Sequence, residues 1–375
     1  MLTIKQIDTK NKSEVNRFVD LPYRLYKKHP QWVPPIRSDV ALMLNKDKHP
    51  FYEHSEADFF VATRDGEEIG RLAVLENRHF NEYHHTKNAQ FYLFDATNDQ
   101  EAATELFARA FEWAKNRGLT DIVGPKGFGP VDGYGLLVEG FEHRQMMNMM
   151  NYNYPYYVQL VENLGFEKEV DFVSAYLNTE TFAIPERIHR IAERARVRSG
   201  LEIKRFASKK ELLSWAPRIG RTYNEAFVNN WEYIPLTDRE IKFVVDNIML
   251  VADYRLFKII THDEDVVGFL FAFPDISAAM QRINGRLFPF GVIDILLEMR
   301  RTKWVSINGA GILSEFHGRG GNALLYSEME KTIREFKFQD ADLTQIAETA
   351  VEMRSDLMNL GGKAYKNHRV YTKQI

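Results

Sequence analysis

Three glycines, Gly318, Gly320 and Gly321, stand within four residues, and His317 and Arg319 stand beside them. A backbone rich in glycine can turn several N–H groups toward one ligand, and the start of a helix adds positive partial charge. The imidazole and guanidinium groups add further donors. This combination favours the binding of an anion such as phosphate. A tight loop that needs glycine only for its positive φ is the alternative.

The neighbouring segments predict how this loop is held. Residues 304–307 are short, β-branched and aromatic, which is typical of a strand. In residues 323–336, leucine, methionine, isoleucine and phenylalanine recur at helical spacing. A strand, a glycine loop and a helix in that order are the parts of an anion site.

The rest of the chain is predicted to form two halves in which strands and helices follow the same order. Residues 60–70 resemble residues 258–268, and Leu164-Gly165 resembles Leu360-Gly361. The separations from the first marker glycine to the second agree closely, at 165 − 70 = 95 and 361 − 268 = 93 residues. Each half has hairpin strands first and strand–helix units after, which predicts an α/β fold with a mixed (α+β) sheet covered by helices. We predict a first domain over residues 1–180, a connector helix over 181–200 and a second domain over 201–375.

Composition limits the classes of function. A net charge of −3 over 375 residues gives no support for nucleic acid or an anionic membrane as a partner. The absence of cysteine excludes disulfides, thiolate catalysis and Cys-ligated zinc. His84 and His85 near His79 lack a firm acidic partner, so we predict no metal. The N-terminal residues do not have the pattern of a signal peptide, and the longest apolar stretch, 287–297, is too short to span a bilayer. A cytoplasmic protein is the expectation.

Residues 287–299 are flanked by Arg286 and by Arg300-Arg301. They predict an inserted helix that covers the substrate side or forms a homodimer contact. A helix lying on a membrane surface is the third alternative.

The element order and the glycine loop resemble those of the GNAT acyltransferase superfamily. The family's signature is Gln/Arg-x-x-Gly-x-Gly/Ala after the fourth strand, and the matching segment is His317-Gly318-Arg319-Gly320-Gly321-Asn322. Gly320 matches, whereas His317 and Asn322 depart from the usual residue types. The closing Leu-Gly and Tyr pattern is matched by residues 357–371. The whole chain also resembles a bacterial group of tandem GNAT-like proteins, through segments 32–35, 70–71, 113–118, 124–125, 135–137 and 140–141.

The resemblance implies that acetyl-CoA, or another acyl-CoA, is the co-substrate. Its pyrophosphate would bind the loop amides, its pantetheine would run beside residues 307–312, and a backbone N–H near Gly311 or Ile312 would stabilise the oxyanion. The implied binding residues are Gly311, Ile312, Leu313, His317, Gly318, Arg319, Gly320, Gly321, Asn322 and Ala323. The corresponding loop of the first half, residues 95–101, has three acids and no glycine, which predicts that this half does not bind coenzyme A in the same manner.

The resemblance identifies the catalytic groups less completely than the residues that bind coenzyme A. The family's frequent general acid is a tyrosine four residues before the Leu-Gly glycine, and Leu357 stands there. Glu348, Tyr365 and Tyr371 are the candidates for general acid or base, with packing or a solvated surface as the alternative for each.

The leading hypothesis is a CoA-dependent N-acyltransferase, of the N-acetyltransferase type, that acts on a small amine or amino-acid-like substrate. An amine can attack the thioester directly, so no cysteine is needed. A non-catalytic acyl-CoA or metabolite-binding protein is the alternative. A transferase that uses aminoacyl-tRNA is a third, which the charge balance does not favour.

Overall fold

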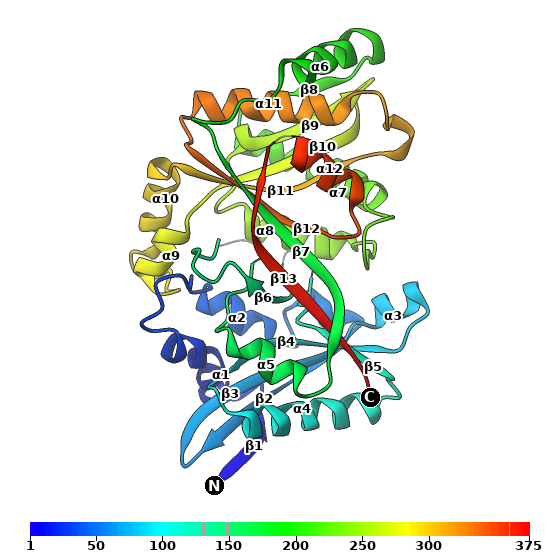
Figure 1. Ribbon diagram of the computed structural model, residues 1–375. Coiled ribbons are helices and arrows are strands. Elements are labelled where there is room, and N and C mark those ends of the chain that lie inside the picture. The colour runs from blue at the N-terminus through cyan, green and yellow to red at the C-terminus, as the bar shows by residue number, and fades with distance from the viewer. Residues whose placement is uncertain (130–131, 147–149, 360) are drawn as a thin grey trace. The chain divides into compact units, whose positions relative to one another are not determined.

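The computed structural model describes residues 1–375 except 130–131, 147–149 and 360 (Figure 1). Packing divides the chain into two units. Unit 1 contains Met1–Val173, Ser277–Asp294 and Tyr365–Ile375, and unit 2 contains Ser174–Ile276 and Ile295–Ala364. The division therefore does not follow the expected boundaries at residues 180 and 200, because two segments from the second half of the chain pack with the first.

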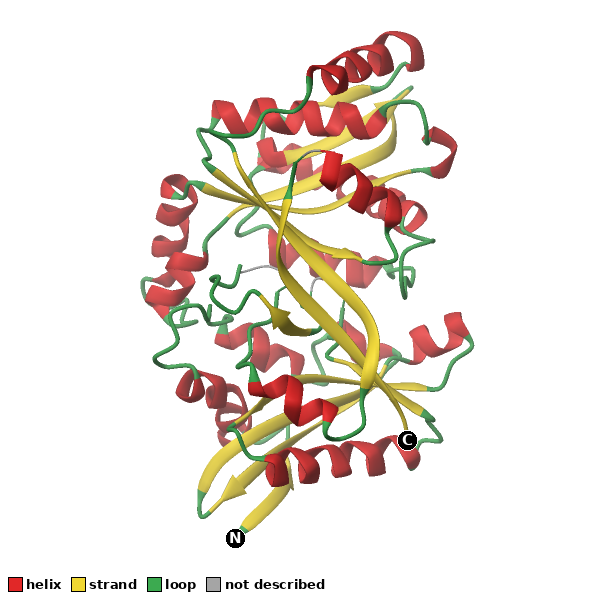
Figure 2. Ribbon diagram, in the orientation of Figure 1, coloured by secondary structure: helices red, strands yellow, loops and turns green. Residues whose placement is uncertain are grey.

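Unit 1 is built on a mixed sheet, as the sequence predicts (Figure 2). Strands β4 and β5 pair in parallel, and the β1–β2, β2–β3, β3–β4 and β5–β13 pairs are antiparallel. Strand β6 pairs with β13 off this path. The order is β1 (Leu2–Gln6), β2 (Glu56–Arg64), β3 (Glu67–Glu76), β4 (Asn88–Ala96), β5 (Asp121–Gly124), β13 (Lys363–Gln374) and the first part of β7 (Glu167–Asn178), with β6 at Leu136–Glu139.

Helix α4 (Gln100–Lys115) buries its apolar side against the sheet of unit 1, where Leu106 and Phe107 meet Leu72 and Phe91. The inserted segment reaches the same unit through backbone bonds, because the Arg37 N–H donates to the Gly285 carbonyl. The other helical elements of this unit are α1 (Lys12–Leu25), α2 (Arg37–Met43), η1 (Pro50–Glu53), α3 (Arg78–His84), α5 (Tyr156–Glu162) and α9 (Ser277–Ile283).

The strands of unit 2 also pair in a mixed pattern. Strands β11 and β12 are parallel, whereas β8–β9, β9–β10 and β10–β11 are antiparallel. The order is the last part of β7, then β12 (Asp340–Ala347), β11 (Trp304–Ile312), β10 (Asp265–Pro274), β9 (Phe257–His262) and β8 (Glu202–Lys204).

Helices cover both faces of the unit 2 sheet. On one face, α11 (Gly321–Glu335) packs Leu324 and Leu325 against Val305, and α6 (Glu186–Ser199) lies beside α11 (Figure 1). On the other face, the Thr222 hydroxyl of α7 (Lys209–Ala226) donates to the Val266 carbonyl. The remaining elements are α8 (Asp238–Ile248), η2 (Tyr254–Leu256), η3 (Ser314–Phe316), α12 (Val351–Asn359) and α10 (Gly291–Arg301), which is divided between the units.

The capping-box spacing of Ser208 with Glu211 and of Thr237 with Glu240 predicts a helix start at each, and both are confirmed. The Ser208 side chain accepts a bond from the Glu211 N–H at the start of α7, and Thr237 forms a capping box with Glu240 at the start of α8. The inserted helix expected over residues 287–299 is confirmed as α10, and a further helix, α9, precedes it. Among the residues that the structure describes, no helix is long and apolar enough to cross a membrane.

Candidate functional site

The glycine loop lies between β11 and α11, wholly within unit 2. Gly318 has a φ of 74° and Gly320 has a φ of 87°, both in the left-handed region that favours glycine. Gly320 is the N-cap of α11 and supplies no side-chain hydrogen bond to the helix. The first N–H groups of a helix have no acceptor inside it, so this helix begins with amides available to an anion.

Two contacts hold the loop in shape. The His317 imidazole Nε2 lies 3.0 Å from the carbonyl oxygen of Ile312 and ties the loop back to β11. A Cβ on Gly320 would lie 3.1 Å from the Cβ of Ala195, so α6 packs directly over this glycine. Arg319 is exposed, with its guanidinium 4.9 Å from the centre of the Phe316 ring. The loop therefore combines a fixed backbone with one exposed cation.

The strand that leads into the loop has an open edge. The β11–β12 ladder ends at the pair Ile307 and Leu343, although β11 continues to Ile312 and β12 to Ala347. A register shift in the β10–β11 ladder leaves Gly309 as the extra residue, with a φ of 67°. A bulge of this kind bends a strand, and bulges are common beside active sites. Within the part of the chain that the structure describes, residues 308–312 thus keep β10 on one edge and have no registered partner on the other.

The direction of the backbone groups on this edge follows from one hydrogen bond. The Leu313 N–H donates to the Val267 carbonyl of β10. Alternate residues of a strand face opposite neighbours, so the N–H of Gly311 also faces β10, whereas those of Ala310 and Ile312 face the open edge. The bond from His317 to the Ile312 carbonyl agrees with this direction.

In the first half of the chain, the helix that corresponds to α11 is α4, and its N-terminus has a different chemistry. Helix α4 has Asp99 as its N-cap, and the Asp99 carboxylate accepts from the Ala102 N–H. Arg64 then binds Asp99 at 3.0 Å and Glu101 at 2.7 Å. A protein carboxylate therefore already occupies the position where an anion would bind.

The three candidate catalytic residues are divided between the two units. Glu348 follows β12 in unit 2 and is half-buried. Tyr365 and Tyr371 belong to β13 in unit 1. The Tyr365 hydroxyl accepts from Lys366 at 3.1 Å, and the buried Tyr371 hydroxyl donates to Glu162 at 3.0 Å. Burial and the Glu162 carboxylate raise the pKa of Tyr371, so it stays protonated. These contacts account for Tyr371 as a packing residue.

Helix α12 is tied to the start of α11 by Asp356. Its carboxylate accepts from the side-chain amide of Asn322 and from the Tyr326 hydroxyl, each at 3.3 Å. Burial and the Asp356 carboxylate raise the pKa of the Tyr326 phenol. Leu357, at the usual tyrosine position, is buried against Ala175 and has a packing role.

One polar cluster was missed by sequence reasoning. Ser306, Asn308, Asp342 and Thr344 are buried and hydrogen-bonded to one another where β11 and β12 part. The signal in the sequence was the alternation of polar with apolar residues at 305–308 and 341–344. The pattern at residues 304–307 predicts only a strand.

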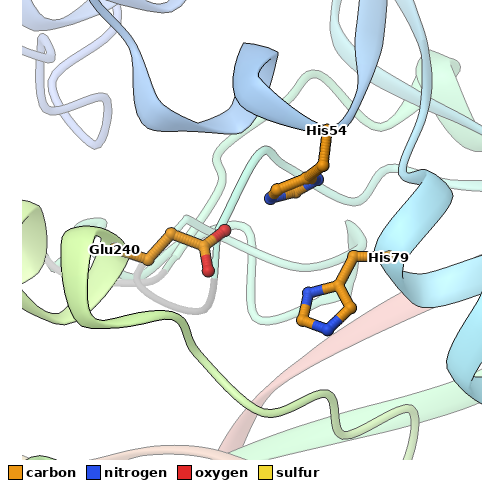
Figure 3. A group of neighbouring side chains, drawn as sticks. All are labelled: His54, His79 and Glu240. Carbon is orange, nitrogen blue, oxygen red and sulfur yellow. The ribbon is translucent and has the colours of Figure 1, made fainter.

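His79, His84 and His85 lie in unit 1, and the expectation that they bind no metal stays a prediction. The rings of His54 and His79 have centroids 5.4 Å apart (Figure 3). His84 ends α3, and His85 is its C-cap with a φ of 55°. Glu240, also drawn in Figure 3, belongs to unit 2, where its carboxylate caps α8 by accepting from the N–H and hydroxyl of Thr237.

Comparison with known proteins adds to this geometry. No protein-family model matches the chain. It is 29% identical over 385 aligned residues to the bacterial ceramide synthase of Caulobacter vibrioides, covering 98% of this chain and 97% of that protein. It is 26% identical to protein YghO of Escherichia coli, covering 97% and 94%.

Solved structures resemble the fold over its full length. A tandem GNAT protein from the clavulanic acid biosynthesis pathway has a TM-score of 0.58 at 14% identity, covering 100% of this chain and 98% of that one. A GCN5-related N-acetyltransferase from Sphaerobacter thermophilus has a TM-score of 0.55 at 12% identity, covering 100% and 95%. The fold is that of a tandem GNAT protein, which confirms the resemblance that the sequence indicates.

Proposed function

We propose that the protein is an acyltransferase that moves an acyl group from a coenzyme A thioester to an amine. One observation carries this proposal: the uncapped, glycine-bounded start of α11 adjoins the open edge of β11. The first feature suits a pyrophosphate, and the second suits an extended arm that pairs like an extra strand. The fold shared with GNAT proteins supports the same reading.

The geometry suggests how the thioester would lie. A pyrophosphate on the amides of Gly321 to Ala323 places the pantetheine along residues 312 to 308, a length of about 16 Å at strand spacing. The thioester then reaches the end of the edge where β11 and β12 part. The N–H of Ala310 lies nearer to that end than the N–H of Ile312, so we propose Ala310 as the oxyanion donor and Ile312 as a partner of the pantetheine. The N–H of Gly311 faces β10, so we do not assign it that role.

The acceptor is proposed from an aromatic cluster beside the open edge. Tyr223 and Phe227 of α7 have ring centroids 4.6 Å apart, and Phe227 lies 5.4 Å from Phe269 of β10. A Cβ on Gly311 would lie 3.1 Å from Phe227 Cε1, so these rings stand directly against the strand. An aromatic wall favours an apolar part in the ligand.

The relative named a ceramide synthase points the same way, because a ceramide is the amide of a long-chain amino alcohol. We therefore propose an amine with an apolar chain as the acceptor. The alternative acceptor is the small, amino-acid-like amine that the sequence suggested.

Free-thiol release gives the test. Acyl-CoA donors from acetyl to palmitoyl are offered with two acceptor classes, short polar amines and long-chain amino alcohols in micelles, and amide formation is followed by mass spectrometry. We expect thiol release that requires an amine and is faster with the long-chain class. Equal or faster reaction of the polar amines would contradict the proposed acceptor, and no thiol release with any pair would contradict acyl transfer.

The non-catalytic alternative has one observation in its favour, the packing role of Leu357 at the position where the family often has a tyrosine. Titration calorimetry with the same donors separates the two. Acyl-CoA binding without thiol release in the presence of any amine would favour a binding protein over an enzyme.

A further inference from the structure

Four buried polar side chains link β11 and β12 where the strands part. The Thr344 hydroxyl donates to the Asp342 carboxylate at 2.8 Å, and it lies 3.1 Å from the Ser306 hydroxyl. Ser306 in turn lies 3.1 Å from Asn308 Oδ1. Asp342 is completely buried, and each of the other three is less than 9% exposed. The Ser306 and Thr344 hydroxyls are therefore within hydrogen-bond distance across the two strands, and either could be the donor.

These four side chains lie on the face of the unit 2 sheet that carries α7. Val305 and Ala341 pack in the core cluster of α11, and alternate residues of a strand point to opposite faces. Ser306, Asn308 and Asp342 therefore point away from α11. This face also holds the aromatic cluster proposed for the acceptor.

Packing alone does not explain these residue types. On the α11 face, the last registered pairs of the same two strands are apolar, Val305 with Ala341 and Ile307 with Leu343. A buried carboxylate costs free energy even when it is hydrogen-bonded, and apolar residues of similar size would fill the space without that cost. A carboxylate at the base of an open edge therefore suggests a role in the reaction.

The hydroxyl protons determine the direction of these hydrogen bonds. Each hydroxyl carries one proton, and Thr344 gives its proton to Asp342. Ser306 is therefore the donor toward Thr344 or toward Asn308. Thr344 Oγ1 keeps lone pairs that can accept a proton while its own proton moves to Asp342.

We propose that Thr344 and Asp342 form the proton-accepting path for the acceptor amine, with Ser306 and Asn308 holding the Thr344 hydroxyl in place. This inference rests on the proposed acyl transfer. The site would take an amine with its nitrogen at Thr344 Oγ1 and the thioester carbon beside it. Thr344 contacts the substrate, and Asp342 is a positioning residue that acts through it.

The step balances in atoms and electrons. The amine lone pair forms the N–C bond to the thioester carbon, and the C–S electron pair leaves with sulfur as the coenzyme A thiolate. The amine proton moves to Thr344 Oγ1 while the Thr344 proton moves to Asp342. The thiolate takes a proton from water, Asp342 returns its proton to solvent, and the products are an amide and free coenzyme A.

Paired substitutions at Thr344 test the path. Thr344→Val removes the hydroxyl at nearly constant shape, and Thr344→Ser keeps it. The matched control is Thr222→Val, because Thr222 is also buried in unit 2 but donates to the backbone carbonyl of Val266 at 2.9 Å. We measure kcat, the KM for acyl-CoA, acyl-CoA binding by calorimetry and thermal unfolding in the full chain.

We expect Thr344→Val to lower kcat by about 10²-fold, the usual contribution of a general base, with the KM for acyl-CoA unchanged. Thr344→Ser should recover most of the rate, and Asp342→Asn should resemble Thr344→Val. Full activity of Thr344→Val would overturn the proposal. An equal loss in Thr222→Val, accompanied by earlier unfolding, would overturn it by indicating a structural role. If the unaltered protein neither binds acyl-CoA nor releases thiol, the proposed function fails first, and this inference falls with it.

Discussion

Gly320 and Gly66 have nearly the same backbone, with φ values of 87° and 88°, but different surroundings. A Cβ on Gly66 would meet nothing within 4 Å, whereas one on Gly320 would press on Ala195 and Ile191 of α6. Either substitution to alanine should cost about 1–2 kcal/mol, because an L-residue is strained in this region. Gly320→Ala should cost more than Gly66→Ala in urea unfolding.

Only Gly320 lies at the proposed anion site, so the two variants should also differ in their affinity for acyl-CoA. We expect Gly320→Ala to weaken acyl-CoA binding by about 10-fold or more, which corresponds to about 1.4 kcal/mol. Gly66→Ala should leave the affinity unchanged in calorimetry. An unchanged affinity in Gly320→Ala would remove the loop from the coenzyme site.

Arg71 and Asp95 form a buried ion pair in unit 1, with Nε of Arg71 2.8 Å from Asp95 Oδ2 and a second bond from Arg71 to the Phe18 carbonyl at 3.0 Å. Removing one partner leaves a buried charge without its counterpart, so Arg71→Met should destabilise the protein by about 3–5 kcal/mol. The control is Arg78→Met, because Arg78 and Glu56 are both nearly half exposed, and an exposed pair contributes at most about 1 kcal/mol. Similar urea midpoints for the two variants would contradict this.

At the scale of elements, the starts of α4 and α11 have opposite chemistry. Asp99 caps α4 with a carboxylate, whereas Gly320 leaves α11 uncapped by any side chain. We therefore expect one acyl-CoA per chain in calorimetry. Asp99→Ala should cost about 1 kcal/mol of stability, the usual value of an N-cap, and leave acyl-CoA affinity unchanged. Two binding events per chain, or weaker binding in Asp99→Ala, would refute this assignment.

The glycine loop and its helix could be predicted from the sequence because their signals are local. Glycine spacing marked the positive φ of Gly318 and Gly320, and apolar periodicity marked α11. The order of elements likewise indicated the fold, since each hairpin and helix carries its own pattern.

The rest of the candidate site depends on pairing between distant segments. The sequence has no local signal for where the β11–β12 ladder ends, so the polar side chains at Ser306 and Thr344 could not be placed at an opening. Tyr371 was a candidate because of its place in a motif. The pairing of β13 with β5, which lies far back in the chain, puts Tyr371 in the core of unit 1 instead.

At the scale of the whole molecule, stability should depend on pH through Lys258. Its ammonium is buried on β9 and donates to Thr332 and to the Arg255 carbonyl, each at 2.7 Å. Burial lowers the pKa of Lys258 to about 8, below the ordinary value of 10.5. Between these two values the unfolded chain binds more protons than the folded one, so the free energy of unfolding from this group rises with pH.

Urea unfolding at pH 7.5 and pH 10 checks this expectation. The difference in stability between Lys258→Met and the unaltered protein should shift in favour of the unaltered protein as the pH rises, by about 2 kcal/mol. The same difference at both pH values would show that Lys258 does not titrate in this range.

The position of β13 has a consequence for the order in which the protein is made. Residues Tyr365–Ile375 belong to unit 1, where Tyr371 pairs with Gly124 of β5, yet the ribosome synthesises them after all of unit 2. Domains usually fold as their residues emerge, but one edge of β5 must wait for its partner. An unpaired strand edge can pair wrongly with another chain. During translation, the first unit is therefore exposed to misassembly until the second has been made.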